Sequence, residues 1–275
     1  MTNGKVVLIT GASSGIGEAT AIRLKEAGFI VYAAARRLDR MKGLKDRGIH
    51  ILKMDVTDDA SMVEGVESTI RDEGRIDILV NNAGYGSYGA LEDVPLSEAT
   101  YQFKVNVFGL ARLTQLVLPS MRKNKCGRII NISSIGGKIY EPMGSWYHAT
   151  KFALEGLSDC LRLEVKDFGI DVVVIEPGGI KTEWEGIAIE NLTKVSGSTA
   201  YKDLAQMVAN LFAAAYKQAS SPDVIAKVIE KAVRAKKPKT RYAAGAGARL
   251  ILFVREVLSD RAFDRLVLGF MKRYK

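Results

Sequence analysis

A short glycine-rich turn near the N-terminus limits the folds that are open to this chain. Residues 10–17 read Thr-Gly-Ala-Ser-Ser-Gly-Ile-Gly, directly after the apolar run 6–9 and before a helical pattern over residues 18–27. Glycines let a backbone approach a ligand closely, and the unpaired N–H groups at the start of a helix attract negative charge. The pattern predicts a strand, a turn and a helix that together hold a pyrophosphate, although similar turns also occur without a ligand.

Strand-like and helix-like segments alternate over most of the chain, which is typical of a parallel sheet covered by helices on both faces. The expected strands are Val6–Ile9, Ile30–Ala34, Ile49–Met54, Ile78–Asn81, Gly127–Ser133 and Asp171–Glu176. The expected helices after the first are Ala60–Glu73, Ala99–Lys123 and Trp146–Phe168. Several strands are almost continuous in Val and Ile, as expected where both faces of a sheet are buried. The sequence therefore predicts an α/β fold, a doubly wound parallel sheet with ligands at the C-terminal strand ends.

Composition narrows the class of protein further. A chain of 275 residues with 47% hydrophobic residues can bury the core of one α/β domain. We expect a cytoplasmic protein, because no charged leader precedes an apolar stretch and no apolar run reaches the 18 or so residues of a membrane span. Two isolated cysteines, Cys126 and Cys160, and two isolated histidines indicate neither a disulfide nor a metal site.

The C-terminal part of the chain differs from the rest in charge. The net charge is +9, and residues 227–275 hold 14 Lys or Arg against 4 Asp or Glu. We expect one sheet domain over residues 1–242, with a helical lid insertion at 182–222, and an amphipathic basic extension at 243–275. One helical stripe of the extension contains Phe263, Leu266, Val267 and Phe270. Such a stripe packs on its own domain or a second subunit, or else lies on an anionic membrane; no motif for nucleic acid accompanies it.

Tyr147 and Lys151 form the clearest candidate for chemistry. Four residues apart on a helix, a phenol and an ammonium lie on one face. A phenol has a pKa of about 10, and bringing it near 7 requires about 3 units, or about 4 kcal/mol. One exposed ion pair rarely supplies so much, so a burying pocket and a second positive charge have to contribute. The alternative is an ordinary Tyr/Lys pair on a helix surface.

Six motifs, in one order and at one spacing, resemble the short-chain dehydrogenase/reductase family in its single-domain form. They span about residues 5–183 and are Thr10-Gly-x-x-x-Gly15-x-Gly17, Asn81-Asn82-Ala83-Gly84, Val-Asn106-Val-Phe-Gly, Ile-Ser-Ser134, Tyr147-x-x-x-Lys151, and Pro177-Gly178 with Thr182. The resemblance implies a Rossmann-type fold, a nicotinamide cofactor and an oxidoreductase that acts on carbonyl or CH–OH groups.

The resemblance also assigns catalytic roles. Tyr147 is expected to be the general acid in carbonyl reduction and the base in alcohol oxidation. Lys151 is expected to lower the pKa of Tyr147 and to hold the nicotinamide ribose. The family spacing selects Ser134 over Ser133 as the serine that hydrogen-bonds the substrate oxygen, where charge develops. Asn106 is expected to help hold a proton-relay water near Lys151, or to satisfy a helix kink.

The family pattern assigns cofactor contacts along the expected crevice. The pyrophosphate is expected at the glycine turn, which comprises Thr10, Gly11, Ser13, Ser14, Gly15, Ile16 and Gly17. The adenine is expected at Asp55 and Val56, and the cleft wall at Asn82, Ala83 and Gly84. Tyr147 and Lys151 are expected at the nicotinamide ribose, and the nicotinamide itself at Pro177, Gly178, Ile180 and Thr182.

The residues after the second strand bear on the choice between NAD and NADP. In NAD enzymes an acidic residue about 20 positions beyond the glycines binds the ribose 2′-hydroxyl. Here that position is Ala35, followed by Arg36 and Arg37, whose guanidinium groups suit a 2′-phosphate. We therefore expect NADP(H). The alternative is that both arginines are merely solvated and that Asp39 reaches a ribose hydroxyl.

The expected substrate pocket is apolar. Its walls are expected from Ser134, Tyr85, Tyr88, Met143, Trp146, Tyr147 and Trp184, with further apolar residues of the 182–222 insertion. A ketone, aldehyde or secondary alcohol of steroid, retinoid or aromatic type fits such walls, and a weak resemblance to hydroxysteroid and retinol-type members agrees. The alternatives are a 3-oxoacyl thioester reductase and a non-catalytic nicotinamide-sensing protein. The family suggests a homodimer or homotetramer through the helices at 99–123 and 146–168.

Overall fold

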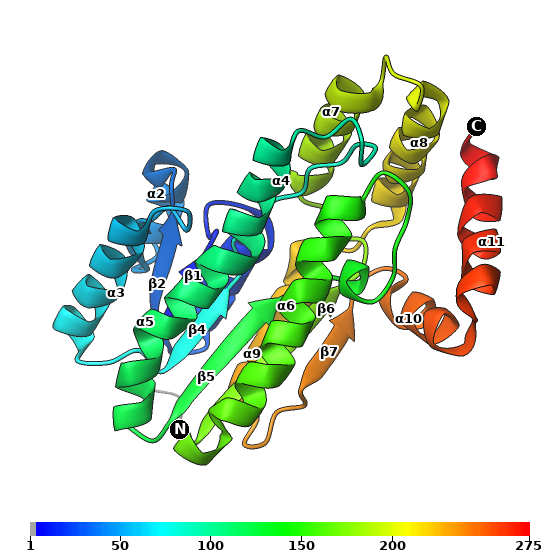
Figure 1. The fold of residues 1–275 in the computed structure, drawn as a ribbon. Helices are drawn as coiled ribbons and strands as arrows, with labels where there is room; N and C mark the ends of the chain where they lie inside the picture. Colours follow the sequence, from blue (N-terminus) through cyan, green and yellow to red (C-terminus); the bar gives the residue numbers. More distant parts are fainter. Residues whose placement is uncertain (1–3) are drawn as a thin grey trace.

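Seven parallel strands form the central sheet of the computed structural model, which describes residues 4–275 (Figure 1). The strands are β1 (Val6–Thr10), β2 (Ile30–Ala35), β3 (His50–Lys53), β4 (Ile78–Asn81), β5 (Gly127–Ile132), β6 (Ile170–Pro177) and β7 (Arg241–Ala244). Their order in the sheet is β3-β2-β1-β4-β5-β6-β7. The chain therefore builds outward from β1 in one direction and then, from β4, in the other. This confirms the doubly wound α/β fold, whose crevice opens beyond the carboxyl ends of β1 and β4.

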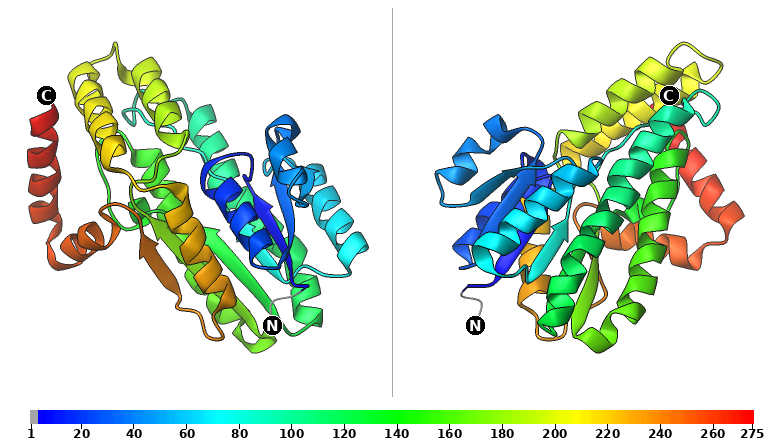
Figure 2. Two further views of the ribbon diagram at one scale, coloured as in Figure 1. Left: turned by 180° about the vertical axis from the view of Figure 1, so that it is seen from behind. Right: turned by 60° about the vertical axis from the view of Figure 1, so that its left-hand side comes forward.

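Helices cover both faces of the sheet (Figure 2). They are α1 (Gly15–Glu26), α2 (Lys42–Lys45), α3 (Asp59–Glu73), α4 (Leu96–Phe103), α5 (Gly109–Lys123), α6 (Ser145–Glu164), α7 (Trp184–Ser196), α8 (Lys202–Gln218), α9 (Pro222–Arg234), α10 (Ala248–Val257) and α11 (Asp260–Met271). One apolar cluster joins the sheet to α1, α2 and α9, and a second joins it to α3, α5 and α6. In β1, Val7 and Ile9 belong to the first cluster, whereas Val6 and Leu8 belong to the second. Burial on both faces explains why the strands are apolar almost without interruption.

The segment expected as one helix over 99–123 has a π-helical turn, η2 (Lys104–Phe108), between α4 and α5. Asn106 lies in this turn and holds the backbone of Tyr85 with both ends of its amide. Its Nδ2 donates to the Tyr85 carbonyl at 2.8 Å, and its Oδ1 accepts from the Tyr85 N–H at 2.8 Å. Single π-turns inside α-helices occur often at functional sites. The amide therefore links the π-turn to the loop after β4, and both roles expected for Asn106, at a proton-relay water and at a helix kink, stay predictions.

The sequence interpretation did not include the seventh strand. β7 pairs with β6, from Val174 opposite Arg241 to Pro177 opposite Ala244. Residues 243 and 244, which the sequence interpretation assigned to the extension, are therefore part of the sheet. A four-residue edge strand that is half-buried throughout has none of the Val/Ile enrichment that revealed the other six strands.

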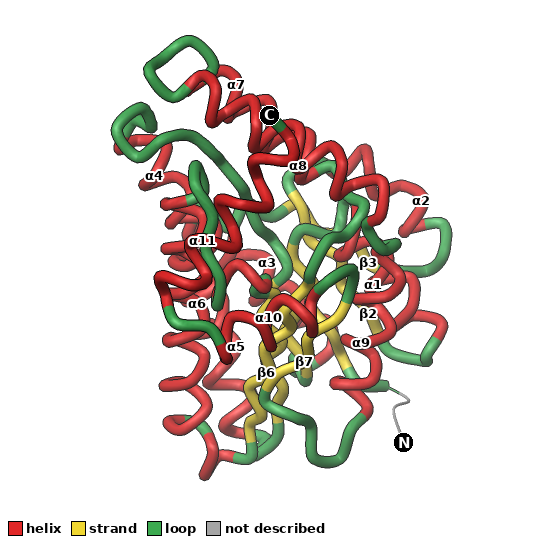
Figure 3. The backbone as a smooth tube through the Cα atoms, turned by 90° about the vertical axis from the view of Figure 1, so that its right-hand side faces the viewer, coloured by secondary structure: helices red, strands yellow, loops and turns green. Residues whose placement is uncertain are grey.

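The last two helices leave the sheet and return to the lid. Figure 3 shows α10 beside the end of β7 and α11 running up toward α8. Met271 and Val267 of α11 join the apolar cluster that also contains Ala188 of α7 and Val208 of α8. Phe263 is buried against Tyr140, while Leu266 and Phe270 of the same stripe are exposed. Within residues 4–275, the helices lack the combination of length and apolarity needed to cross a membrane.

Candidate functional site

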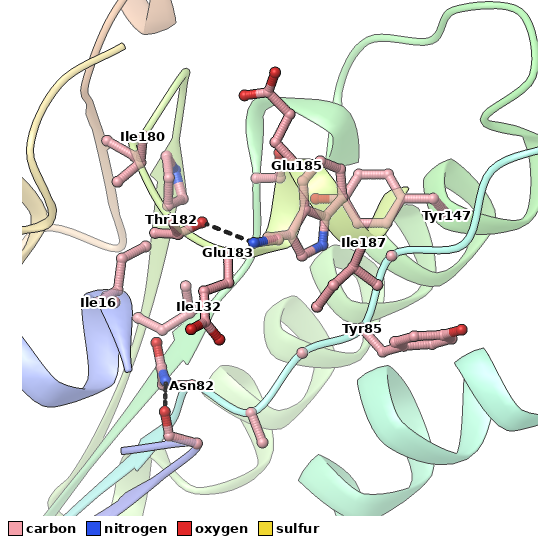
Figure 4. Close-up of a pocket in the computed structure, with 18 of the residues that line it drawn as sticks. Ile16, Asn82, Tyr85, Ile132, Tyr147, Ile180, Thr182, Glu183, Glu185 and Ile187 are labelled. Carbon is pink, nitrogen blue, oxygen red and sulfur yellow. Dashed lines mark hydrogen bonds between the residues drawn. The ribbon is translucent and has the colours of Figure 1, made fainter. Parts of the chain in front are cut away.

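A cavity of about 490 Å³ lies at the carboxyl ends of the strands, and residues of α7 and α8 line part of it. Figure 4 shows some of the lining side chains, among them Tyr147 and Thr182. The cavity brings together segments that are distant in the sequence, from the glycine turn to the lid. Of the residues expected at the site, those that line the cavity are Gly11, Ser13, Ser14, Gly15, Ile16, Arg36, Arg37, Asp55, Val56, Asn82, Ala83, Gly84, Tyr85, Ser134, Tyr147, Lys151, Pro177, Gly178, Ile180, Thr182 and Trp184. Tyr88 lines it as well.

Three expected site residues lie behind the cavity wall and support it. Thr10 Oγ1 accepts hydrogen bonds from the N–H groups of Asn82 and Ala83, at 3.1 and 3.0 Å. Gly17 packs so closely that an added Cβ would lie 2.4 Å from the Gly11 carbonyl oxygen. Asn106, described above, is also absent from the wall.

The structure differs from the prediction at Trp146 and Met143. Trp146 contacts Phe103 edge-on, with ring centroids 6.4 Å apart, and does not line the cavity. Successive residues of a helix point about 100° apart, so Trp146 faces α4 when Tyr147 faces the cavity. Met143 is buried in the apolar cluster that includes residues of α7 and α8, and it does not line the cavity.

The glycine turn has the backbone geometry that close contact with phosphate requires. Gly11 and Gly15 have φ angles of +65° and +59°, a region that other residues rarely adopt. Ser14, the residue before α1, makes no capping hydrogen bond with its side chain, so the first N–H groups of the helix remain available. Gly15 approaches Thr182, whose Cγ2 would lie 3.0 Å from an added Cβ. These features fit a dinucleotide that extends from α1 towards Thr182.

Tyr147 and Lys151 project from α6 into the buried centre of the cavity. The Lys151 ammonium donates to the Ile132 carbonyl at 2.9 Å and lies 5.9 Å from the centroid of the Tyr147 ring. Ser134 Oγ accepts from the Gly136 N–H at 3.0 Å and interacts with the Tyr147 side chain. The three groups expected from the sequence to act together are therefore neighbours.

Burial dominates the electrostatics of this pair. It raises the pKa of Tyr147 to about 12, against a lowering interaction with Ser134, and the charge of Glu141 raises it further. Burial also lowers the pKa of Lys151 to about 8, although the Glu155 carboxylate acts in the opposite direction. The sequence predicts that a burying pocket and a second positive charge help Lys151 to lower the phenol pKa. In the free protein burial acts in the opposite direction, because desolvation disfavours the charged forms of both Tyr147 and Lys151.

The carboxyl end of β2 carries positive charge. Ala35 ends the strand, and the Arg36 and Arg37 side chains beyond it line the cavity. Arg36 Nη1 donates to the Tyr101 hydroxyl at 2.8 Å, and Arg37 lies 3.8 Å from Glu183. Asp39, the alternative ribose ligand, is exposed and absent from the cavity wall.

Aromatic rings form the end of the cavity around Tyr147, away from the arginines that follow β2. Tyr147 lies 5.0 Å from Trp184 and 5.6 Å from Tyr88, measured between ring centroids. Phe212 of α8 lies 5.1 Å from Tyr88 in an edge-on arrangement. Glu141 and Glu185 also line the cavity, and the sequence interpretation assigned neither of them to the site. The only signal for Glu141 was a charged residue between Ser134 and Tyr147.

The family model and the sequence relatives that match this chain agree with one another. A sequence model described as short chain dehydrogenase matches residues 5–191. The 3-ketodihydrosphingosine reductase of Bacteroides thetaiotaomicron is 45% identical over 178 residues, which make up 65% of this chain and 65% of that protein. The NADPH-dependent 3-dehydrocapnine reductase of Ornithobacterium rhinotracheale is 32% identical and covers 98% of each chain.

Solved structures agree with the sequence relatives. A short-chain dehydrogenase from Streptomyces avermitilis matches with a TM-score of 0.81 and 32% identity, over 99% of this chain and 98% of that one. Similar folds were solved with either nucleotide: a serine dehydrogenase with NADP+ (TM-score 0.76, 26% identity, 87% and 94% coverage) and a xylitol dehydrogenase with NAD+ (0.72, 29%, 83% and 92%). The cavity geometry and these comparisons lead to one conclusion: the chain belongs to the short-chain dehydrogenase/reductase family.

Proposed function

We propose that this protein is an NADPH-dependent oxidoreductase that interconverts an apolar ketone and its secondary alcohol. Membership of the family already makes it an oxidoreductase of CH–OH groups. The observation that carries the finer proposal is the buried group of Ser134, Tyr147 and Lys151, which shares one cavity with the glycine turn and an aromatic wall.

The proposed cofactor follows from the side chains at the end of β2. Arg36 and Arg37 offer guanidinium groups to a 2′-phosphate, and Ala35 offers no carboxylate to a 2′-hydroxyl. Solved relatives contain either NADP+ or NAD+, so this choice depends on the residues of this chain. The cofactor would be held by the glycine turn at the pyrophosphate and by Lys151 at the ribose.

The reaction divides into a hydride and a proton transfer. When bound, the reduced nicotinamide supplies a hydride to the carbonyl carbon. Tyr147 donates its hydroxyl proton to the carbonyl oxygen, and the Ser134 hydroxyl stabilises the charge that develops there. The raised pKa of Tyr147 keeps the phenol protonated in the free protein, so it is ready to act as an acid in reduction. Lys151 stabilises the phenolate that remains.

The apolar wall supports a ketone substrate over a small polar one. Tyr88, Trp184 and Phe212 surround the reactive hydroxyl with rings, which suit a steroid, a retinoid, an aromatic ketone or another apolar chain. Two sequence relatives are named as reductases of a 3-keto and a 3-dehydro compound, which supports the reductive direction.

Two exposed apolar surfaces support proposals about partners. Phe108 of η2 is 57% exposed, and Phe152 and Leu163 of α6 are 46% and 70% exposed. We propose that a second copy of the chain covers them, and sedimentation of Phe152→Lys as a monomer would support this.

On α10, Leu250 and Phe253 are 68% and 61% exposed within the basic segment. A peripheral contact with anionic lipid is proposed there, and Phe253→Ser should weaken binding to phosphatidylserine vesicles.

The decisive test is the loss of nicotinamide absorbance with NADPH across apolar ketones, aldehydes and 3-oxoacyl thioesters. Tyr147→Phe should lower turnover by roughly 10²–10⁴-fold, because it removes the general acid, and should keep NADPH binding. Tyr242→Phe, on β7 and outside the cavity wall, is the matched control and should retain activity. Turnover of thioesters alone would favour the thioester reductase, and bound NADPH without any turnover would favour a cofactor sensor.

A further inference from the structure

The Glu141 carboxylate borders the reactive tyrosine, and within the described residues no ammonium or guanidinium group forms an ion pair with it. Glu141 lies in the loop 138–144, between η3 (Ile135–Gly137) and α6, and it lines the cavity. Its side chain is 24% exposed, and its charge acts on both Tyr147 and Tyr88. Within residues 4–275, the one basic side chain that pairs with it is His148, whose Nε2 lies 3.9 Å away.

The hydrogen bonds of His148 indicate that its ring is neutral. Its Nδ1 lies 2.8 Å from the Gly136 carbonyl, so this nitrogen carries the proton and donates it. Its Nε2 accepts from the backbone N–H of Glu141 at 3.2 Å. One donor and one acceptor describe a neutral imidazole, with the tautomer assigned from these partners. The Glu141 carboxylate accepts instead from the Tyr88 hydroxyl at 3.0 Å, so its negative charge is not balanced by a positive one.

The surroundings of this carboxylate have the composition of an ammonium site. Tyr88, which holds Glu141, also contacts Trp184 and Phe212, at 5.9 and 5.1 Å between centroids. Aromatic faces attract cations, and a carboxylate adds a charge-assisted hydrogen bond. The other cations on the cavity wall face different partners, because Arg36 and Arg37 lie at the end of β2 and Lys151 is bound to the Ile132 carbonyl.

We propose that Glu141 binds an ammonium group of the substrate, so that the natural substrate is an apolar-chain amino ketone or the corresponding amino alcohol. This inference deepens the proposed function and depends on it. The carboxylate adjoins the aromatic rings around Tyr147, so the amino group would lie near the carbonyl, with the apolar chain against the lid.

The loop that carries Glu141 is held in place before any substrate binds. The Met143 carbonyl accepts from the Gly89 N–H at 2.8 Å, and Met143 itself has a φ of +69°, unusual for a residue with a side chain. On the other side, the Tyr140 hydroxyl donates to Asp264 of α11 at 2.9 Å. A carboxylate fixed in this way loses little freedom when it binds a ligand, which favours affinity.

The experiment compares two secondary alcohols that differ only in an ammonium or a methyl group on the carbon next to the carbinol, oxidised with NADP+. The wild-type protein should prefer the ammonium compound by about 10-fold or more in kcat/KM, the range of a hydrogen bond to a charged group. Glu141→Gln keeps an acceptor for Tyr88 but removes the charge, and it should abolish the preference, mainly through KM. Glu185→Gln, a second carboxylate of the same cavity, is the matched control and should keep the preference.

Calorimetry with n-octylammonium and 1-octanol separates the two proposals. Binding of octylammonium that exceeds that of octanol and disappears in Glu141→Gln supports the ammonium site, even if neither alcohol is oxidised and the proposed function fails. Turnover of both alcohols with equal preference in wild type and Glu141→Gln overturns the ammonium site and leaves the proposed function intact. Equal binding of both probes overturns it as well.

Discussion

The two ends of the cavity are built in different ways. At the nucleotide end, much of the wall is backbone: the glycine turn and the segment after β4, both within the first 84 residues, form it with close approaches, and residues 177–182 after β6 complete it. At the substrate end, the wall is side chains from four separate segments, and the last helix supports it through Met271. A site built from backbone groups depends on the main-chain conformation and only weakly on the identity of most side chains. A side-chain site can be remodelled without disturbing the sheet, so the first end carries the cofactor and the second the specificity.

Removal of Met271 tests this division most strongly. Met271 is 2% exposed, and the buried residues of its cluster belong to the lid and to the loops around Tyr147. Met271→Ala should cost about 2–5 kcal/mol of local stability, as for other buried methionines. Hydrogen exchange should rise in α7, α8 and α11, and the KM for an apolar substrate should rise while NADPH affinity is retained.

A methionine in the central core provides the matched control. Met121 is fully buried between the sheet and α5. Met121→Ala should cost a similar free energy of unfolding, but the loss should appear as global destabilisation in urea, with both ligands bound normally under native conditions. Parallel losses of NADPH and substrate binding in Met271→Ala would mean that the two ends are one unit.

Lys151 lies where the two ends meet, and its burial predicts a pH dependence of stability. Its pKa is about 8 in the folded protein and 10.5 ordinarily, so between these values the unfolded chain binds more protons. Stability associated with Lys151 therefore rises with pH over this window and is lost as pH falls through 8. At pH 7, Lys151→Met should be more stable than wild type by about 3 kcal/mol, and the difference should vanish towards pH 10.5.

Urea unfolding of both proteins at several pH values measures this difference. Lys166→Met, on the surface, is the control, and its effect should be small and independent of pH. A Lys151→Met difference that stays constant from pH 7 to pH 10 would contradict the burial of an ionisable amine at this position.

The difference between the nucleotide end and the substrate end also explains which features could be predicted from the sequence. The glycine turn, the Asn82–Gly84 segment and the Tyr147/Lys151 pair are local patterns, and each one lies where the pattern indicates. Six strands were found because burial on both faces demands Val and Ile, but β7 is a short edge strand without that signal. The π-turn at Asn106 was not predicted because a single turn of five residues between two α-helices is too short to show a period of its own.

Other features depend on contacts between distant segments, which a sequence pattern does not contain. Trp146 was expected beside Tyr147 in the pocket, but its direction on the helix is settled by Phe103 of α4. The pKa of Tyr147 is raised rather than lowered because its side chain is buried, and this burial depends on how the lid and α6 pack around it. The position of Glu141 depends on His148, Tyr88 and the contact of Tyr140 with α11.

Arg36→Ala sharpens the comparison at the nucleotide end, where a side chain rather than the backbone is proposed to discriminate. Loss of a charge-assisted hydrogen bond to the 2′-phosphate should weaken NADPH binding by roughly 10- to 100-fold, while NADH binding is unchanged. Fluorescence titration of both nucleotides measures the ratio. Arg40 lies outside the cavity wall, although its partner Glu183 lines it, so Arg40→Ala should change the ratio much less. Equal losses for NADPH and NADH in Arg36→Ala would refute the assignment.

Two helical glycines, one at each end of the cavity, test the difference between the nucleotide end and the substrate end, because glycine to alanine adds a single methyl group. A Cβ at Gly17 of α1 would lie 2.4 Å from the Gly11 carbonyl oxygen, whereas a Cβ at Gly186 of α7 would meet nothing within 4 Å. Gly17→Ala should therefore displace the turn, destabilise the fold by about 1–3 kcal/mol and weaken both nucleotides. Gly186→Ala should stabilise α7 by about 0.5–1 kcal/mol, since alanine loses less backbone freedom in a helix, and should leave nucleotide binding unchanged.

Thermal unfolding with and without NADPH measures the effects of both substitutions. Equal behaviour of the two variants would mean that the nucleotide end adapts as readily as the lid, and that the rigidity of the glycine turn is not what holds the cofactor.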